Sequence, residues 1–361
     1  MCNGGVLHEA TRTPNAAHRR YAAHMLVSGY MEPLDFLAIG DIVTEPFIRL
    51  KEAEIITKPS GEVDLAMRWG DKIPYDYVVQ MPAVGNAANA AVSAARLQIK
   101  SGLNAFLGKD ALGDECLEVL KQQGVSTEYM VQEEGKETNH HFVLWFDSDR
   151  TILVKHTEFD YAPPELTASP KWIYLSSLSE HSLPFHQALV EFLAKHPDSK
   201  LTFQPGTFQM AMGVEALKGI YERSELFVVN KEEAERILKL TPHEEIPTLL
   251  KGLKELGPAI VVVTDGTNGA YAYDGNEMLI VPMYPDQDPP FERTGAGDAF
   301  ASSVSVALAL GKPLREALLW GPINSMSVVQ KVGAREGLLT REQLEKYLAD
   351  APASYVVSKL V

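Results

Sequence analysis

The sequence predicts an α/β fold of three layers, with a mainly parallel central sheet covered by helices on both faces and a small β lid. The first observation is the alternation, from Phe36 onward, of short apolar runs with longer stretches of helical periodicity. Strands and helices interleaved in this way form parallel sheets with two buried faces. The second observation is that β-branched and aromatic residues alternate with polar ones in 45–58 and 138–156. This pattern is typical of half-exposed antiparallel strands, so we expect a small sheet that projects from the main body.

The alternation begins with FLAIG (36–40), a short apolar run that predicts a buried strand. The segment NAANAAVSAARLQI (86–99) has small and apolar residues at helical spacing, with Asn86 as its expected N-cap. NAFLG (104–108) predicts the next strand, and GDECLEVLKQQG (113–124) predicts a helix that ends at its last glycine. The first part of the chain therefore has the order strand, helix, strand, helix.

The second part continues the same order. Strand, helix, strand, helix, strand, helix and strand are predicted in turn at 172–177, 184–196, 201–206, 207–224, 226–230, 231–240 and 259–266. The last of these, AIVVVTDG, is the clearest buried strand because it is apolar and β-branched throughout its first half. After Gly297 the pattern is almost wholly helical to the end of the sequence.

Residues 35–361 are expected to form one domain, because no linker rich in Pro, Gly or Ser divides them. Residues 1–34 are expected to be an N-terminal extension without a fixed structure. They lack the apolar core of a signal peptide. Met25 and Met31 are alternative starts, so the sequence leaves open whether residues 1–30 belong to the native protein.

The composition excludes several classes of partner. The chain has 361 residues and a net charge of −15, which argues against nucleic acid or an anionic membrane as the main partner. It has two cysteines, Cys2 and Cys116, without metal-ligand spacing, and no apolar run approaches the roughly 20 residues that span a bilayer. A reducing cytoplasm is the expected location.

The stretch FERTGAGDAFASSVSVALAL (291–310) carries the strongest chemical signal. Gly295 and Gly297, on either side of Ala296, permit backbone angles that let successive N–H groups point at one spot. The helix that follows adds the positive end of its dipole, so the sequence predicts an anion hole. Asp298, in the first turn, lies beside it. A carboxylate there suits phosphoryl transfer to an alcohol, although an N-cap role for Asp298 stays open.

RTGAGDAF resembles the signature of the ribokinase-like, or PfkB, family of sugar and nucleoside kinases. The resemblance runs from about Phe36 to about Leu348 and is specific because further motifs follow the family's order. These are GDIVTE, VGNAANAA, GKDALGDECLEVLKQQGV, NKEEAE, VTDGTNGAYAY and GPINSMSVVQKVGAREGLL. It implies a ribokinase-like fold and an ATP-dependent kinase that phosphorylates a hydroxymethyl group of a small sugar.

On the nucleotide side, the resemblance implies that Asp298 is the catalytic base and that the three residues before it form the anion hole. Asn230 and Glu233 are implied to organise Mg²⁺ beside the ATP phosphates, Glu233 indirectly, through water. Considered without the family, Glu233 would be a solvated helix residue. The other residues implied to bind the nucleotide are Thr264, Asp265, Gly266 and Gly269 in one turn, and Asn324 beside adenine.

On the acceptor side, the resemblance implies that Glu45, Gly85 and Asn89 bind the substrate. An acidic group and an amide can hold vicinal hydroxyls through charge-assisted hydrogen bonds. Without the family, Asn89 would be an inward polar residue and Glu45 a strand-edge charge. Glu45 stands where the family usually has aspartate, and Val84 replaces the first glycine of a pair.

Glu292 and Arg293 occupy positions where the family usually has Asp-Thr, and that Asp helps to bind a monovalent cation in many members. Glu292 keeps the charge on a longer side chain, so activation by K⁺ stays open. Arg293 is either a surface residue or a contact to a phosphate, which suits its planar, charged fork.

Two alternatives to a sugar kinase remain at this point. A nucleoside kinase of the same fold would stack the base between aromatic side chains, for which Phe47, Phe142, Trp145 and Phe159 are available. A nucleotide- or sugar-binding regulator without turnover is favoured by the two departures at Val84 and Arg293, and disfavoured by Asp298. The projecting β segment is expected to be a lid over the site or the surface of a homodimer.

Overall fold

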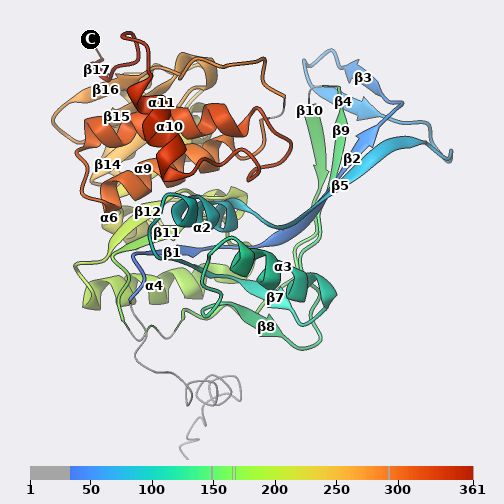
Figure 1. Ribbon diagram of the computed structural model, residues 1–361, viewed down its shortest axis with the longest axis horizontal. Coiled ribbons are helices and arrows are strands. Elements are labelled where there is room, and N and C mark those ends of the chain that lie inside the picture. The colour runs from blue at the N-terminus through green and yellow to red at the C-terminus, as the bar shows by residue number, and fades with distance from the viewer. Residues whose placement is uncertain (1–32, 148, 165, 167, 292, 361) are drawn as a thin grey trace, which may run out of the picture. The chain divides into compact units, whose positions relative to one another are not determined.

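A nine-stranded mixed sheet forms the centre of the computed structural model, which describes residues 33–147, 149–164, 166, 168–291 and 293–360 (Figure 1). Six neighbouring strands are parallel: β6 (Ser101–Asn104), β1 (Phe36–Ile39), β11 (Trp172–Leu175), β12 (Lys200–Phe203), β13 (Leu226–Asn230) and β14 (Ile260–Thr264). Three antiparallel strands extend the sheet beyond β14: β15 (Ala270–Tyr273), β16 (Met278–Val281) and β17 (Ser358–Lys359). The three-layer, mainly parallel prediction is confirmed, whereas the expectation of an almost wholly helical C-terminal segment missed β17.

Helices cover both faces of the sheet because alternate strand residues point to opposite sides. On one face Ala38 and Tyr174 pack under five helices: α2 (Asn86–Arg96), α3 (Ala111–Gln122), α9 (Ala296–Ala309), α10 (Leu314–Val328) and α11 (Arg341–Ala349). On the other face Ile39 and Leu175 pack under four helices: α4 (Leu183–Lys195), α6 (Lys218–Arg223), α7 (Lys231–Leu238) and α8 (Ile246–Glu255). Short helical turns complete these layers: η2 (Glu180–Ser182), α5 (Thr207–Met212) and η3 (Gly266–Asn268).

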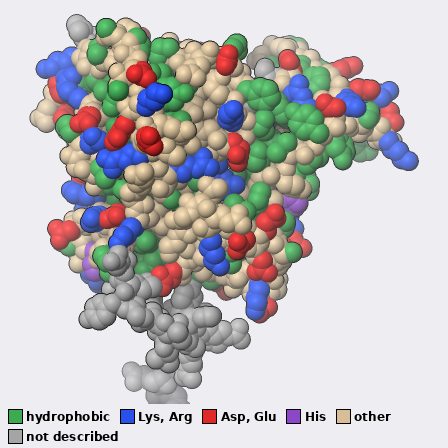
Figure 2. Space-filling model, viewed as in Figure 1, with side chains coloured by type: hydrophobic (Ala, Val, Ile, Leu, Met, Phe, Trp, Pro, Cys, Tyr) green, Lys and Arg blue, Asp and Glu red, His purple; other side chains and the backbone are tan. Residues whose placement is uncertain are grey.

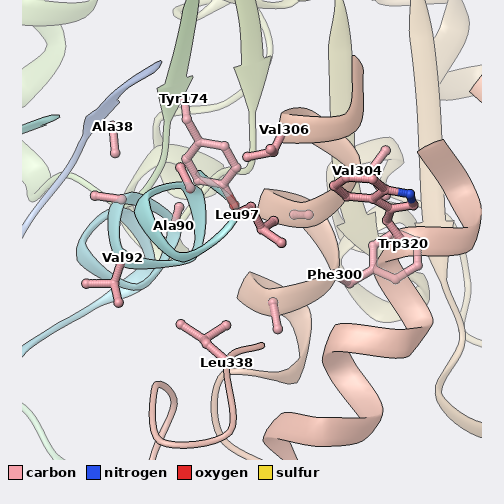
Figure 3. Close-up of a cluster of buried hydrophobic side chains, with 14 of the residues drawn as sticks. Ala38, Ala90, Val92, Leu97, Tyr174, Phe300, Val304, Val306, Trp320 and Leu338 are labelled. Carbon is pink, nitrogen blue, oxygen red and sulfur yellow. The ribbon is translucent and has the colours of Figure 1, made fainter. Parts of the chain in front are cut away.

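The first face carries the closest helix packing. Figure 3 shows Ala90 of α2 near Tyr174, and Phe300 and Val304 of α9 beside Trp320 of α10. Helix α2 contains five alanines that are fully buried or nearly so, and their small side chains allow its backbone to approach α9. The hydroxyl of Ser302 in α9 donates to that of Ser93 in α2 at 2.8 Å. This packing places the N-terminal ends of the two helices together, which positions the site described below.

A second sheet projects from the main body (Figure 1). Its strand order is β10 (Asp149–Leu153), β9 (Phe142–Phe146), β2 (Val43–Leu50) and β5 (Tyr75–Val84), with a β3 (Glu54–Thr57) and β4 (Val63–Ala66) hairpin beyond it. We call these six strands the lid. A separate pair, β7 (Phe106–Gly108) and β8 (Val131–Glu133), lies against the main body.

The lid differs from the prediction in three ways. Its two central strands, β2 and β9, pair in parallel, because each enters the lid directly from the main body. The predicted strand at 45–58 is divided between β2 and β3 by a bend, and β5 was not predicted at all. In the main body, the predicted strand at 104–108 is divided between β6 and β7.

The helix at 86–99 begins one residue away from the predicted cap. Gly85 is the N-cap of α2, with φ at 116°, a conformation that L side chains rarely adopt. A Cβ atom there would lie 2.8 Å from the carbonyl oxygen of Asp41. Asn86 is therefore the first helical residue, not the cap, and its side chain is available for another partner.

The base of the lid is fixed by a buried arginine. Arg335 donates from Nη1 to the carbonyl oxygen of Ala83 at 3.0 Å and from Nη2 to that of Pro82 at 2.5 Å. Ala83 has φ at 59°, so these bonds hold β5 in an unfavourable conformation just before Gly85.

Among the residues described, no helix is long and apolar enough to cross a membrane. The expected extension at 1–34 lies, up to residue 32, outside the described residues.

Candidate active site

Two adjoining cavities lie where β13 and β14 end. The polar cavity has a lining rich in carboxylate, amide and guanidinium groups, including Glu45, Asn89, Asn230, Glu233 and Asp298. The apolar cavity is lined largely by Met283, Tyr284, Phe300, Pro322, Met326 and Val329. Thr264, Arg293 and Gly297 line both cavities, so a group bound in one can reach the other past these three residues.

The N-terminal end of α9 forms the boundary between the cavities. Gly295 is the N-cap and has φ at 80°, and a Cβ atom there would lie 2.4 Å from the Cβ of Ala334. Only glycine fits this position. The first intrahelical bond of α9 runs from Ala299 N to the carbonyl oxygen of Gly295, and Ala296 N makes a long bond of 3.4 Å to Arg293. A helix leaves its first N–H groups without intrahelical acceptors, so such donors lie at the boundary between the two cavities.

Asp298 is held in this cavity by three side-chain amides. Asn86 donates to Oδ1 at 2.7 Å, Asn89 donates to Oδ2 at 2.8 Å, and Gln204 donates to Oδ1 at 3.4 Å. Tyr174 in turn donates to Oε1 of Gln204. The carboxylate is thus fixed by groups on α2 and in the segment after β12, rather than capping its own helix. Oδ2 keeps one lone-pair direction for a hydroxyl group.

The environment of Asp298 sets its basicity. The side chain is 7% exposed, and burial raises the pKa of its carboxyl, while the hydrogen bonds from Asn89, Asn86 and Gln204 partly counteract that rise. A carboxylate with a raised pKa is a better proton acceptor near neutral pH than an ordinary aspartate. Asp298 therefore combines a fixed orientation with increased basicity.

Asn86 and Gln204 also belong to the site, because both donate to the Asp298 carboxylate, although neither is predicted from the sequence as a site residue. Asn86 is three residues before Asn89, so the two amides share one face of α2. That spacing was a usable signal for Asn86. Gln204 follows β12, and its contact with Asp298 depends on how α9 packs on the sheet. Tyr174 lies within β11, and no neighbouring residue in the sequence indicates that it contacts Gln204.

The predicted acceptor residues come together in the polar cavity. Glu45 of β2, Gly85 and Asn89 all line it, together with Arg150 and Ile152 of the lid strand β10. Among the described residues, Oδ1 of Asn89 is buried without a hydrogen-bond partner. The same amide can therefore hold Asp298 through its nitrogen and accept from a ligand hydroxyl through its oxygen.

Asn230 and Glu233 also line the polar cavity, at the junction of β13 and α7. They form a reciprocal capping box: Glu233 N donates to Oδ1 of Asn230 at 2.8 Å, and Asn230 N donates to Oε2 of Glu233 at 2.9 Å. Burial raises the pKa of the Glu233 carboxyl, and the bond from the Asn230 backbone partly lowers it. The capping box fixes Glu233 instead of leaving it solvated.

The other predicted nucleotide residues divide into two groups. Thr264, Gly266 and Gly269 line the apolar cavity, whereas Asp265 is not among its lining residues and accepts from Asn268 at 3.0 Å. Asn324 does not reach either cavity. It is fully buried, its Nδ2 donates to Ser303 at 2.8 Å, and its Oδ1 accepts from Leu339 N at 2.9 Å. The placement of Asn324 beside adenine is therefore corrected, because its amide is used between helices.

The sequence model described as "pfkB family carbohydrate kinase" matches residues 76–341, which is most of the chain. The chain belongs to the PfkB family of carbohydrate kinases. The match includes the N-terminal ends of both α2 and α9, and thus Asn86, Asn89 and the segment around Asp298. Glu45 lies outside the matched range.

Individual proteins support membership of the PfkB family. The chain is 26% identical over 275 residues to the ribokinase of Bacillus subtilis (strain 168), covering 73% of this chain and 87% of that enzyme. Arabidopsis thaliana ribokinase, solved with ribose and ATP, superimposes with a TM-score of 0.72 at 19% identity, over 88% of this chain and 99% of that one. Methanocaldococcus jannaschii nucleoside kinase gives a TM-score of 0.67 at 21% identity, over 90% and 100%. The ribokinase-like fold is thereby confirmed.

The lid contacts the segment that precedes α9. Phe291 packs edge-on against Trp145 of β9, with 5.4 Å between ring centroids, and the Arg49 guanidinium lies 4.5 Å from the Trp145 ring. Phe291 N donates to the carbonyl oxygen of Val329, which lines the apolar cavity. Glu292, the residue considered for a monovalent cation, lies outside the described residues.

Proposed function

We propose that the protein transfers the γ-phosphoryl group of ATP to a hydroxymethyl group of a small sugar. The observation that carries this proposal is the position of Asp298. A buried carboxylate with a raised pKa lines the polar cavity, beside helix N–H groups at the boundary with the apolar cavity. This arrangement supports the proposal, because phosphoryl transfer to an alcohol requires a proton acceptor next to donors for the phosphoryl oxygens.

In this proposal each residue has a defined task. Asp298 orients the acceptor hydroxyl and takes its proton late in the transfer, because the transition state is loose. Gly295, Ala296 and Gly297 provide N–H donors for phosphoryl oxygens. Asn89 orients the Asp298 carboxylate through its nitrogen, and its oxygen accepts a hydrogen bond from a hydroxyl group of the sugar. Glu45 binds a further hydroxyl group of the sugar. The apolar cavity takes the adenine.

ATP is proposed to bind with Mg²⁺, which neutralises phosphate charge when bound. Among the described residues, no group of three or more His, Cys, Asp or Glu side chains could hold a metal ion. That result fits a Mg²⁺ held mainly by phosphates and waters, the usual situation for this ion. Glu233, fixed by its capping box in the polar cavity, would hold such waters.

Replacement of Glu233 tests this assignment. We expect Glu233→Gln to raise the Mg²⁺ concentration for half-maximal activity by about tenfold, a typical loss when an outer-sphere partner is removed. Activity at saturating Mg²⁺ should largely recover. Glu232→Gln, on the same turn, is the control. A Mg²⁺ titration of both variants that matches the wild type would contradict the role.

Arg293 is proposed to contact the transferred phosphoryl group, because it is one of three residues that line both cavities. We expect Arg293→Thr, which restores the usual family residue, to lower kcat by about 10- to 100-fold through loss of a charge-assisted contact. Arg293→Lys should recover part of the loss, since it keeps the charge and not the fork. Equal kcat values for all three proteins would place Arg293 on the surface only.

A sugar acceptor is favoured over a nucleoside by the lining of the polar cavity. Its described lining residues include no aromatic side chain on which a base could stack. Phe47 and Phe159 are buried in the core, and Trp145 is covered by Arg49 and Phe291. The remaining aromatic candidate, Phe142, is 41% exposed on the lid.

The proposal is tested by measuring ADP release from MgATP in the presence of hexoses, pentoses and nucleosides, with Asp298→Asn as the inactive control. Acceptor-dependent release with a pentose or hexose is expected. Release with a nucleoside only would support the alternative acceptor class. ATP binding without acceptor-dependent release in any case would identify a binding protein and overturn the kinase proposal.

The lid is also proposed to form a homodimer interface, with a second copy of this chain as its partner. Most large apolar side chains exposed in the described residues lie on the lid strands and the segments beside them: Ile55, Ile56, Val63, Met67, Trp69, Tyr75, Tyr77, Val78, Phe142, Ile152, Leu153 and Val154. Figure 2 shows hydrophobic side chains gathered over this sheet. A patch of this kind on a soluble fold marks an interaction surface. The lid's charged groups pair with each other, as Lys51 does with Asp76 at 3.6 Å.

We expect light scattering to give twice the chain mass for the wild type. Ile55→Lys combined with Leu153→Lys should shift the protein to the monomer by burying unpaired charge in the interface. Val356→Lys is the control, because Val356 is as exposed as Ile55, at 54%, and lies outside the lid. A monomeric wild type would exclude the dimer.

A further inference from the structure

A cluster of unsatisfied polar groups lies at the base of the lid. Asp41 follows β1, His141 immediately precedes β9, and His156 lies shortly after β10. Among the described residues, Oδ2 of Asp41, Nε2 of His141 and Nδ1 of His156 are buried without a hydrogen-bond partner. His156 Nδ1 is 3.9 Å from Asp41 Oδ2, and the two imidazole rings are 5.1 Å apart. Buried polar groups normally have partners, so three lying together indicate a ligand-binding position.

The rest of the cluster is firmly held. Tyr161 donates to the other Asp41 oxygen at 2.7 Å, and Ser179 donates to Tyr161 at 2.8 Å. His141 N donates to the carbonyl oxygen of Thr44 at 3.1 Å. Asp41 itself is 7% exposed. Hydrogen bonds therefore hold the Asp41 side chain and the His141 backbone in place, so these two residues do not belong to a loose segment.

The cluster adjoins the polar cavity. His141 Nδ1 lies 3.5 Å from Oε1 of Glu45, which lines that cavity. Gly85, another lining residue, packs so close to the Asp41 carbonyl oxygen that it has no room for a side chain. Contacts thus continue from the cavity through Glu45 to His141, His156 and Asp41.

The chemistry of the cluster selects its ligand. Among the described residues, no group of three or more His, Cys, Asp or Glu side chains, this cluster included, could hold a metal ion. An anionic group is disfavoured by the two carboxylates, and no lysine or arginine forms an ion pair with either of them among the described residues. Burial and the neighbouring His141 lower the pKa of His156, which keeps this imidazole neutral. A carboxyl group and imidazole nitrogens together offer acceptors and donors, which hydroxyl groups match.

We propose that Asp41, His141 and His156 bind hydroxyl groups of a neutral polyhydroxy acceptor, at the end remote from the hydroxyl that receives the phosphoryl group. This subsite rests on the proposed kinase function. It accounts for the two histidines at the lid base, which lie next to Glu45 and Asp41. It also makes the cluster, rather than the residues around Asp298, the place where acceptors are distinguished.

The test compares steady-state kinetics of the wild type, Asp41→Asn and His156→Phe. The wild type is first assayed with D-ribose, D-fructose, D-fructose 6-phosphate and adenosine. All proteins are then compared with the acceptor that gives the wild type its highest kcat/KM. Both variants should raise KM for that acceptor by about 10- to 100-fold, the loss expected when a buried polar partner is removed. KM for ATP and kcat should stay within about threefold. His181→Phe is the control, since His181 is 61% exposed and pairs with Glu158 at 3.7 Å.

A 2-deoxy-D-ribose series refines the result if D-ribose is the preferred acceptor. Loss of the 2-hydroxyl group should lower kcat/KM for the wild type. It should cause no further decrease in the variant that lacks the side chain binding this hydroxyl group. If the wild type is active and both variants keep the wild-type KM for the acceptor, the subsite alone would be overturned, even if the melting temperatures of the variants fell. Preference for D-fructose 6-phosphate would also overturn it. A wild type inactive with every acceptor would overturn the kinase proposal, and the subsite with it. If Asp41→Asn does not fold, His156→Phe decides, because His156 is partly exposed.

Discussion

Asp298→Asn is expected to lower kcat by roughly 10²–10⁴-fold, the usual range for loss of a general base, with little change in KM for ATP. The substitution is nearly isosteric, and Asn86 and Asn89 are both donors to the carboxylate, so one of them would face an amide donor in the variant. The acceptor hydroxyl loses its proton acceptor as well. Initial rates of ADP release at saturating MgATP measure the effect.

The pH dependence gives an independent check. Asp298 must be ionised to act as a base, and burial raises its pKa. Wild-type activity should therefore fall, as the pH is lowered, at a higher pH than for an ordinary aspartate. The residual activity of Asp298→Asn should lack this acid limb. A variant with wild-type turnover, or with the same acid limb, would remove Asp298 from the mechanism.

Gly297→Ala is expected to reduce kcat by about 10²–10³-fold without unfolding the protein, comparable to loss of an oxyanion-hole donor. A Cβ atom at this position meets only Gln204 Nε2, at 3.8 Å, so the folded chain accommodates it. The methyl group would, however, occupy space where the two cavities join, and displace phosphoryl oxygens from the helix N–H groups.

Gly295→Ala provides the contrast to this variant. Alanine in the left-handed conformation costs about 1–2 kcal/mol, and contact with Ala334 at 2.4 Å adds to that cost. We expect a lower melting temperature for Gly295→Ala and an unchanged one for Gly297→Ala. Thermal unfolding and kinetics on both proteins separate folding from catalysis. Full activity in Gly297→Ala would place the phosphoryl group elsewhere.

The parts of the site that could be predicted from sequence are those encoded by neighbouring residues. Gly295, Gly297 and Asp298 act through one helix terminus, and Asn230 and Glu233 are three residues apart in one capping box. Such features depend on local backbone geometry, which the sequence specifies directly. The alternation of strands and helices is equally local, and the three-layer fold followed from it.

What could not be predicted depends on contacts between distant segments. Gln204 reaches Asp298 because α9 packs on the face of the sheet, where Thr202 of β12 and Ser305 of α9 share a hydrogen bond. Asn324 has the polarity of a ligand-binding residue, yet the close packing of helices turns its amide inward to Ser303. The parallel pairing of β2 and β9 likewise joins segments almost a hundred residues apart, and strand patterns do not encode partner choice.

The contact between Phe291 and Trp145 links the lid to the chain just ahead of Arg293. If the lid swings away, this aromatic pair must separate, and the indole exchanges the Phe291 ring for solvent, while Arg49 stays beside it on the neighbouring lid strand. The intrinsic fluorescence of Trp145 should therefore change when the lid opens or closes, and stopped-flow measurements could follow this change without an added label. It would also show whether sugar or nucleotide arrives first.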